Sequence, residues 1–304
     1  MQPIDVHIHT NTQCNLRCIH CYEDSDKTIK MKISNKFELQ LVEYLCGNYA
    51  ADIHLEGGEV FLEEELIKTL GNLSNENLKS ITITTNGLKR THDQKTLRVL
   101  SSISCLRISV EGHTDSLHRA VRKCALQSIL DNARYYKGLG VRVVLRITLN
   151  RLNMNTIFAE TIPALEKLGF DEFQIYELQP VGRAKTANIY IETPLTAFYE
   201  DWLEHPSNTK IKVSLPERRI NETVEYIARL HKINVVEHYV DDNASISIGV
   251  DGFVRICPWD LHSKPLIQIT EKNIANLEGV IKFQHTPHEC EHCTRIVLKG
   301  GYPC

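Results

Sequence analysis

The chain has 304 residues, of which 42% are hydrophobic and 24% are charged, and its net charge is -3. This composition is ordinary for a globular protein, and the length suffices for one large α/β domain with a small appended domain. The lack of a basic block argues against generic nucleic-acid binding, and the lack of a run of about 18 apolar residues argues against a membrane span. The first residues do not follow the pattern of a signal peptide, so we expect a cytoplasmic protein.

Short β-branched or apolar runs alternate with longer amphipathic stretches as far as residue 177. The runs predict strands over residues 4–9, 52–55, 80–84, 106–110, 142–148 and 172–177. The stretches between them predict helices over residues 34–46, 63–73, 93–100, 126–136 and 156–168. This α/β alternation predicts a parallel sheet with right-handed crossovers. Six units are too few for an eight-fold barrel, so we expect a partial (β/α)6 barrel of the TIM type, with reactive groups at the carboxyl ends of its strands.

Beyond residue 185 the pattern is less regular. Helices are expected near residues 194–204 and 222–230, with a break at His205-Pro206. Short strands joined by Asp251-Gly252 then predict a β-hairpin over residues 245–256. We therefore expect three parts, a core over 1–205, a connecting helical segment over 206–234 and a cysteine-rich domain over 235–304.

The ten cysteines argue for metal or redox chemistry rather than disulfides in a cytoplasmic protein. Cys14, Cys18 and Cys21 lie within eight residues of one another. Thiolates are soft ligands that select zinc, Cu(I) or iron–sulfur clusters. Three thiolates can hold three irons of a 4Fe–4S cube and leave the fourth iron open to another molecule. A zinc loop and three unrelated thiols are the alternatives.

The run Cys14-Asn15-Leu16-Arg17-Cys18-Ile19-His20-Cys21-Tyr22 resembles the cysteine motif of radical S-adenosylmethionine (radical SAM) enzymes. In that family a 4Fe–4S cluster reductively cleaves SAM to a 5′-deoxyadenosyl radical, which abstracts hydrogen from a substrate. The resemblance implies a partial barrel, a SAM-binding [4Fe-4S] cluster on the three cysteines and SAM as cofactor. It also implies contacts to the cofactors from His20 and Tyr22, and a low-potential electron donor such as ferredoxin or flavodoxin.

Two turns after predicted strands extend this resemblance. Gly57-Gly58-Glu59 is similar to the family's Gly-Gly-Glu, which holds the amino group of the SAM methionine, and glycines let the backbone approach a ligand closely. Thr84-Thr85-Asn86-Gly87 is similar to the family's Thr-Asn-Gly, which implies a cofactor contact from Asn86. A plain turn is an equal alternative for this second segment.

The segment after the fourth strand resembles the family's Ser-x-Asp-Gly, with His118, Arg119 and Arg122 following. The resemblance implies that Ser109 contacts the SAM ribose and that Arg122, or alternatively Arg119, pairs with the SAM carboxylate. A guanidinium suits this role because its fork binds both carboxylate oxygens. Glu111 stands where aspartate is usual, and either arginine can instead be a surface residue.

The C-terminal cysteines Cys257, Cys290, Cys293 and Cys304 resemble the SPASM or shorter twitch auxiliary domain. Four thiolates can fully ligate one cluster, so the resemblance implies one auxiliary [4Fe-4S] cluster. A structural zinc site is the alternative, with His285, His288 and His292 nearby. Pro180-Val181-Gly182-Arg183-Ala184 resembles a stretch in relatives that carry this second cluster.

Cys124 follows the Ser109–Arg122 segment and is a candidate catalytic residue, because some radical SAM epimerases return a hydrogen atom from a cysteine. Its alternative role, shared with Cys46 and Cys105, is that of a small buried apolar residue. The resemblance favours modification of a ribosomally made peptide by crosslink, thioether or epimerisation. The alternatives are dehydrogenation or rearrangement of a small molecule, such as a sugar, aminocyclitol or cofactor precursor, and a non-enzymatic zinc protein. Only 13 residues precede Cys14, so we expect no fused leader-peptide domain.

Overall fold

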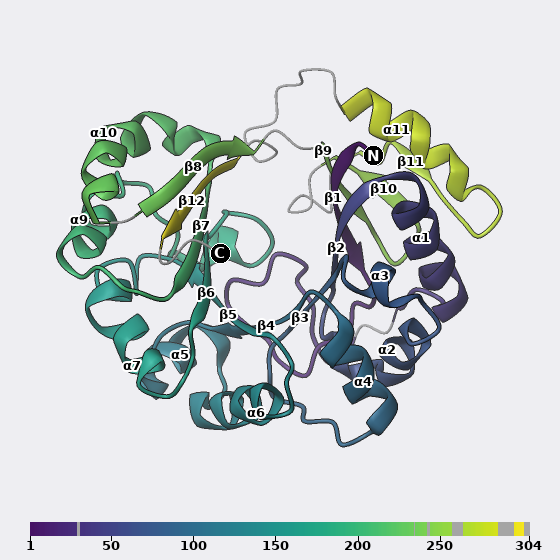
Figure 1. Ribbon diagram of the computed structural model, residues 1–304, viewed down its shortest axis with the longest axis horizontal. Coiled ribbons are helices and arrows are strands. Elements are labelled where there is room, and N and C mark those ends of the chain that lie inside the picture. The colour runs from purple at the N-terminus through teal and green to yellow at the C-terminus, as the bar shows by residue number, and fades with distance from the viewer. Residues whose placement is uncertain (29–30, 234, 242–243, 257–263, 285–294, 301–304) are drawn as a thin grey trace.

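The computed structural model describes residues 1–28, 31–233, 235–241, 244–256, 264–284 and 295–300. The strands in these residues are β1 (Pro3–His9), β2 (Ala50–Glu56), β3 (Ile81–Thr85), β4 (Cys105–Val110), β5 (Val143–Leu149), β6 (Glu172–Glu177), β7 (Lys210–Pro216), β8 (Val235–Asp241), β9 (Ala244–Ile248), β10 (Phe253–Arg255), β11 (Ile267–Gln268) and β12 (Arg295–Gly300). They form one sheet in the order β11-β10-β9-β1-β2-β3-β4-β5-β6-β7-β12-β8 (Figure 1).

The sheet is parallel from β9 through β1 to β7, while β10 and β12 run antiparallel to their neighbours. Because β11 and β8 are its two edges, the curved sheet formed by the described strands does not close on itself. The predicted partial barrel is therefore confirmed, and each of the six predicted strands forms at its expected place. Parallel strands in one sheet bring their carboxyl ends, and the loops that follow them, to the same side.

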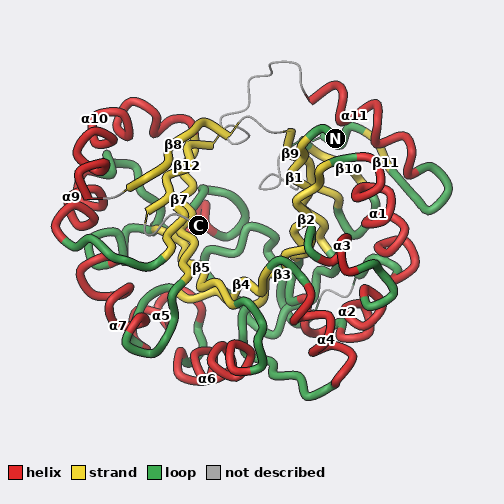
Figure 2. The backbone as a smooth tube through the Cα atoms, viewed as in Figure 1, coloured by secondary structure: helices red, strands yellow, loops and turns green. Residues whose placement is uncertain are grey.

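The helices lie mostly on the outer face of the curved sheet (Figure 2). They are α1 (Asn35–Asn48), α2 (Glu64–Leu70), α3 (Asn75–Leu78), α4 (Gln94–Ser102), α5 (Asp115–Arg122), α6 (Leu126–Gly138), α7 (Ile162–Glu166), α8 (Ala184–Ala187), α9 (Thr196–Glu204), α10 (Ile220–Leu230) and α11 (Leu277–Gln284). Side-chain caps fix where several begin: Ser34 accepts a hydrogen bond from Phe37 N before α1, and Asp93 accepts one from Thr96 N before α4. A π-helical turn, Ile157–Thr161, leads into α7.

Residues of β1 and β2 alternate between an apolar and a polar face of the sheet. Ile4, Val6 and Ile8 belong to the apolar core, whereas the residues between them carry charged or imidazole groups on the other face. His7 pairs in register with His54, and their rings stack with centroids 4.7 Å apart. The inner face of the barrel is thus polar, in contrast to the usual apolar filling of such barrels.

Strand β7 extends the parallel sheet within the segment that was expected to be a helical connection. Ile211, Val213 and Leu215 are buried in the core, and the polar residues alternating with them hid this strand in the sequence. The predicted hairpin forms between β9 and β10, and Gly252 in its turn has a φ of +75°. Strand β9 pairs with β1 and β12 pairs with β7, so described strands of residues 235–304 continue the sheet of the core.

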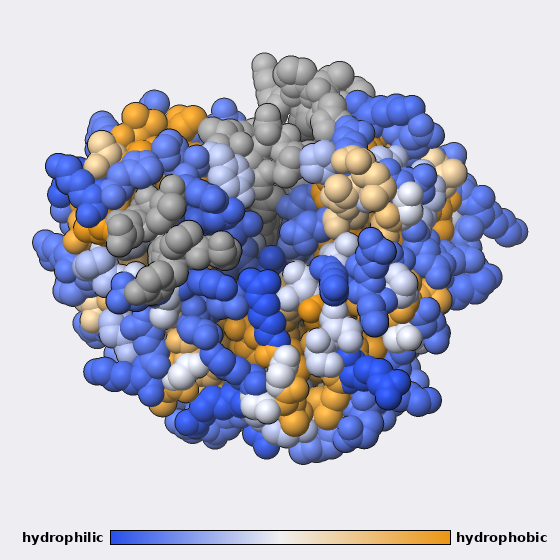
Figure 3. Space-filling model, viewed as in Figure 1, coloured by the Kyte–Doolittle hydropathy of each residue, from blue (hydrophilic) through white to orange (hydrophobic). Residues whose placement is uncertain are grey.

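The visible surface is mostly hydrophilic, with apolar patches of limited extent (Figure 3). Among the described residues, no helix combines the length and apolar character that crossing a membrane requires.

Candidate metal and cofactor site

A cavity of about 140 Å³ lies at the carboxyl ends of the parallel strands. The three cysteines of the first loop line it, together with Gly57, Gly58 and Glu59 from the turn after β2. The ends of the later strands contribute Thr84, Thr85, Ser109, Thr148, Tyr176 and Glu177. The topology therefore gathers residues of β2 to β6, and of the loops that follow β1, β2, β3 and β6, around one space.

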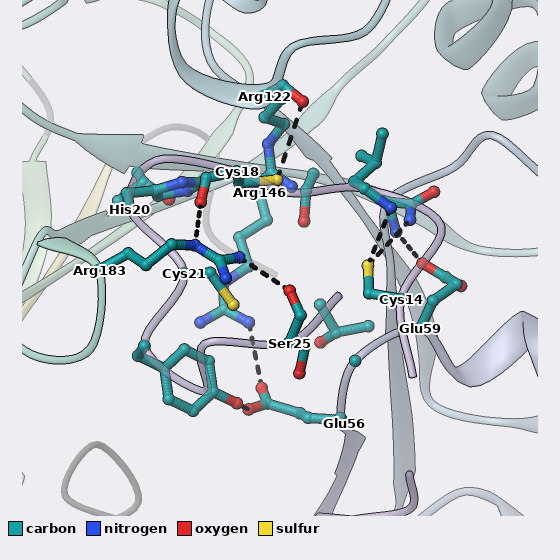
Figure 4. A pocket seen from close by; sticks show the side chains of 18 of the residues that line it. Cys14, Cys18, His20, Cys21, Ser25, Glu56, Glu59, Arg122, Arg146 and Arg183 are labelled. Carbon is teal, nitrogen blue, oxygen red and sulfur yellow. Dashed lines mark hydrogen bonds and ion pairs between the residues drawn. The ribbon is translucent and has the colours of Figure 1, made fainter. Parts of the chain in front are cut away.

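Cys14, Cys18 and Cys21 all lie on the wall of this cavity (Figure 4). All three are free thiols. Burial raises the pKa of Cys14 to about 12 and that of Cys21 to about 11, so without a metal these groups keep their protons. A soft metal centre can displace those protons, and binding then releases them.

The loop that carries the cysteines is held in place by Gly182 and Arg183. Arg183 donates from Nε to Cys18 O at 2.8 Å and from Nη2 to Ser25 O at 2.8 Å. Gly182 has a φ of +55°, and a Cβ there would lie 2.4 Å from Tyr22 O. The Pro-x-Gly-Arg-Ala stretch after β6 thus packs directly against the backbone of the cysteine loop.

Gly57 and Gly58 allow the segment before Cys14 to run against the end of β2. A Cβ on Gly57 would lie 2.6 Å from Asn11 O, and one on Gly58 would lie 2.2 Å from Gln13 O. The two segments are joined by hydrogen bonds from Gly58 N to Asn11 O and from Glu59 N to Gln13 O, each 2.8 Å long. Both glycines are therefore required by backbone packing, whatever ligand lies beside them.

The carboxylate of Glu59 is buried and accepts three hydrogen bonds from protein donors. They come from Thr85 Oγ1 at 2.6 Å, from Asn86 N at 2.8 Å and from Phe61 N at 3.0 Å. Burial raises the pKa of Glu59 even though these hydrogen bonds favour its charged form. Glu59 therefore organises the turns after β2 and β3, and a ligand ammonium would meet a carboxylate whose acceptor positions are mostly in use.

Asn86 links the turn after β3 to the cysteine loop. Its Nδ2 donates to Asn15 Oδ1 at 2.7 Å and lies 3.9 Å from Cys14 Sγ. Ser109, at the end of β4, is buried and lines the cavity. Both residues thus line the cavity beside the cysteine loop.

Arg122 lines the cavity as part of a buried charge cluster with Glu111 and His20. Glu111 Oε1 accepts from Arg122 Nε at 2.7 Å and lies 3.2 Å from His20 Nε2. Burial disfavours ionisation of Glu111, but Arg122 and His20 outweigh it and lower the pKa of the carboxyl group. Arg119 instead lies on the surface and pairs with Asp115, so Arg122 is the arginine that faces the cavity.

Tyr22 and three residues that the sequence reading did not single out form a second polar wall. Glu56 accepts from Tyr22 OH and from Arg146 Nη1, each at 3.0 Å. The guanidinium of Arg146 also lies 4.6 Å from the centroid of the Tyr176 ring. The sequence feature that could have identified these residues is the recurrence of polar side chains at every second position along β2, β5 and β6.

Cys124 packs beside Cys14 and Cys18 but is not among the residues that line the cavity. Its Sγ lies 3.4 Å from Nε2 of His118, a fully buried histidine whose pKa burial lowers to about 4. Because His118 Nδ1 accepts from Glu111 N at 3.3 Å, its proton is on Nε2 and points at the sulfur. The predicted ligands Cys257, Cys290, Cys293 and Cys304 lie outside the described residues.

The residues on the wall fit the cofactors that the sequence implied. Three thiols on one wall of the cavity suit a cluster with one open iron, and the cavity provides space beside them. His20 Nδ1 is buried in this wall and has no hydrogen-bond partner among the described residues, so a polar ligand can satisfy it.

Comparison with known proteins supports the same assignment. The family model described as the radical SAM superfamily matches residues 8–168. The Bacillus subtilis peptide biosynthesis protein YydG is 25% identical over 186 residues, which are 60% of this chain and only 56% of YydG. The sporulation killing factor maturation protein SkfB of B. subtilis is 25% identical over 97% of this chain and 69% of SkfB.

Two further matches cover most of the chain. A protein of Saccharolobus islandicus named as a probable GTP 3′,8-cyclase is 25% identical over 93% of this chain and 88% of its own length. The crystal structure of Streptococcus suis SuiB bound to S-adenosylmethionine has the same fold, with a TM-score of 0.66 at 14% identity over 93% of this chain and 68% of SuiB. Since the family model covers more than half of the chain and its cysteine motif lines the cavity, the protein belongs to the radical SAM superfamily and is an enzyme that uses a 4Fe–4S cluster and SAM.

Proposed function

We propose that this radical SAM enzyme modifies a ribosomally made peptide. Support comes from one relative named for peptide biosynthesis and from another named for maturation of a sporulation killing factor, which matches almost the whole chain. The alternative substrate is a small molecule, and it is favoured by the match to a probable GTP 3′,8-cyclase. The position of the cavity carries the proposal, because it opens at the loop ends of the strands, where a peptide segment can enter.

In this proposal Cys14, Cys18 and Cys21 hold the cluster, which supplies the electron that cleaves SAM. Arg183 and the backbone of Gly58 fix the loop so that its three sulfurs keep their spacing. Arg122 offers its remaining guanidinium donors to the SAM carboxylate while Glu111 compensates its charge. His20, Tyr22, Asn86 and Ser109 provide the polar contacts to the rest of the cofactor, with Gly57 and Glu59 shaping the turn beneath it.

The C-terminal part completes the proposal. Cys257 follows β10, and Cys290 and Cys293 precede β12. We assign them, with Cys304, to one auxiliary [4Fe-4S] cluster in a SPASM- or twitch-type domain over residues 235–304. A low-potential donor such as ferredoxin or flavodoxin would supply the electrons.

Replacing Cys14, Cys18 and Cys21 together by Ala should then abolish SAM cleavage and leave the iron of one cluster, whereas loss of all iron from the folded protein would contradict two clusters.

The substrate is tested by anaerobic co-expression with any short peptide encoded beside the gene, followed by high-resolution mass spectrometry of the peptide. Loss of two hydrogens indicates an oxidative crosslink, and deuterium uptake from heavy water without another change indicates epimerisation. The triple cysteine variant and Cys46→Ala are the negative and positive controls, because Cys46 lies outside the cavity. An unmodified peptide from an enzyme that cleaves SAM, together with turnover of GTP or another small molecule, would reject the peptide assignment.

A further inference from the structure

A second cavity, of about 440 Å³, lies at the amino ends of the same strands. Its wall is made by residues at the start of β2 to β7 and at the end of β12, which runs in the opposite direction. Five lining residues are cationic and three are acidic, which leaves an excess of two positive charges. The cationic residues are Arg107, Arg142, Lys210, Lys212 and Lys299, and the acidic residues are Asp52, Glu172 and Glu237.

Arg107 is the most unusual of these residues because its charge is buried without a direct counter-ion. Its side chain comes from β4 and only 7% of the residue is exposed. Among the described residues no carboxylate oxygen lies within 4.0 Å of its guanidinium, and its Nε has no hydrogen-bond partner. Burial disfavours this charge, but the more distant carboxylates of Asp52 and Glu56 help to outweigh it and raise the pKa of Arg107, so Arg107 stays charged while its Nε is left without an acceptor in the described part of the chain.

Among the described residues, the close partner of Arg107 is an imidazole and not a carboxylate. Arg107 Nη1 lies 2.7 Å from His54 Nδ1. Since a guanidinium can only donate, Nδ1 accepts and the proton of a neutral His54 is on Nε2, which lies 2.7 Å from Asp5 Oδ1. In this arrangement both ring nitrogens of His54 are in use, so His54 has no lone pair to offer a metal ion beside Asp5 and His7. We therefore interpret Asp5, His7 and His54 as a hydrogen-bonded support for Arg107.

The lysines of the cavity add positive charge along β7 and β12. Lys212 and Lys299 lie directly opposite each other in the β7–β12 pair, where like charges are destabilising. Lys299 pairs with Glu237 at 2.8 Å. Lys210 and Lys212 have no ion-pair partner within the part of the chain that the structure describes.

We propose that this cavity is a binding site for a phosphate-bearing small molecule, with Arg107 at its base and Lys212 and Lys210 beside the phosphate. A phosphate group carries two negative charges, which match the excess of the wall, and it accepts the forked donors of a guanidinium. The volume exceeds that of a phosphate ion, so the ligand is a phosphorylated organic molecule. This inference is independent of the substrate proposed above, because the cavity opens at the other end of the strands.

The test uses the full-length, cluster-loaded protein and measures binding of pyrophosphate and inorganic phosphate by calorimetry and by thermal shift at constant ionic strength. Acetate is the monovalent comparison. We expect pyrophosphate to raise the melting temperature and acetate to have no effect. Arg107→Gln should weaken pyrophosphate binding at least about tenfold, since a hydrogen bond to a charged group is worth about 1.5–3 kcal/mol.

A second variant and a second readout keep the proposal falsifiable. Lys212→Met should weaken binding severalfold, whereas Arg134→Gln, which removes an exposed cation paired with Asp131, should leave it unchanged. Without any anion, Arg107→Gln should still unfold in one cooperative thermal transition, which shows that the variant is folded when its binding is measured. Equal binding by all four proteins, no binding of either phosphate, or equally tight binding of acetate would each overturn the proposal.

Discussion

Glu111 and Arg122 form an ion pair that is almost wholly out of contact with water, with Glu111 Oε1 2.7 Å from Arg122 Nε. The pair joins the end of β4 to the end of α5, directly behind Cys18, whose Sγ lies 4.0 Å from Arg122 O. The arginine that faces the cavity is therefore charge-compensated by the protein before any ligand binds. Glutamate in place of the family's aspartate gives the carboxylate one more methylene with which to reach this guanidinium.

Replacing one partner of this pair should destabilise the protein more than replacing both. Glu111→Gln leaves Arg122 buried without its counter-ion, which typically costs about 3–5 kcal/mol, and urea unfolding should show this loss. The double variant Glu111→Gln/Arg122→Gln should recover part of it. Arg119→Gln, at an exposed pair, is the control and should change stability by about 1 kcal/mol or less. Additive effects of the two single substitutions would show that the pair is not coupled.

Gly58→Ala should prevent the cysteine loop from forming. The new Cβ would lie 2.2 Å from Gln13 O, which belongs to the backbone and cannot move aside cheaply. We expect a destabilisation of about 3 kcal/mol or more and a loss of bound iron, measured by denaturation and iron analysis. Gly138→Ala is the matched control, because nothing lies within 4 Å of its Cβ and it is in helix α6. That control should be neutral or stabilise by up to about 1 kcal/mol, and equal behaviour of the two variants would contradict the packing argument.

The fold was predictable wherever strands were apolar and helices separated them. Strands β1 to β6 have buried β-branched or leucine side chains on one face, and the loops between them are long enough for a helix. Strand β7 was missed because Lys212 and Ser214 alternate with its apolar residues and His205-Pro206 precedes it. Its place is fixed by pairing with β6 and β12, and pairing between distant segments leaves no local sequence signal.

The three cysteines that line the cavity could be singled out from the sequence, whereas the charge partners in its wall could not. The short spacing in the sequence singled out Cys14, Cys18 and Cys21, because three thiols so close together indicate one shared metal site. The partners Glu56 and Arg146 come from strands 90 positions apart in the sequence. Only the register of the sheet brings them together, so single-sequence patterns show each as an isolated polar residue.

The stability of the protein should fall as the solution becomes alkaline, because His7 holds a proton between Asp5 and Glu56. Burial disfavours the imidazolium, but the two carboxylates outweigh it and raise the pKa of His7 to about 9 from 6.5. The stabilisation is fully present below pH 6.5 and is lost as the pH rises through about 9. The difference corresponds to about 3 kcal/mol.

His7→Gln should therefore flatten the fall in melting temperature between neutral and alkaline pH. Thermal denaturation of the wild type and this variant over that range measures the difference in slope. His92→Gln is the control, because His92 is exposed and lies outside the barrel interior. Parallel curves for the wild type and His7→Gln would show that His7 is not the group that titrates.

Arg183→Lys should loosen the cysteine loop without removing a positive charge. The guanidinium of Arg183 reaches Cys18 O, Ser25 O and Asp24 Oδ1 together, and an ammonium group cannot match this fixed fork. We expect a loss of about 1–3 kcal/mol in the stability of the loop and release of iron to a chelator several times faster than from the wild type. Arg119→Lys, on the exposed face of α5, is the matched control and should release iron at the wild-type rate. Equal rates for all three proteins would mean that other contacts hold the loop, and the Gly-Arg pair after β6 would then be only a turn.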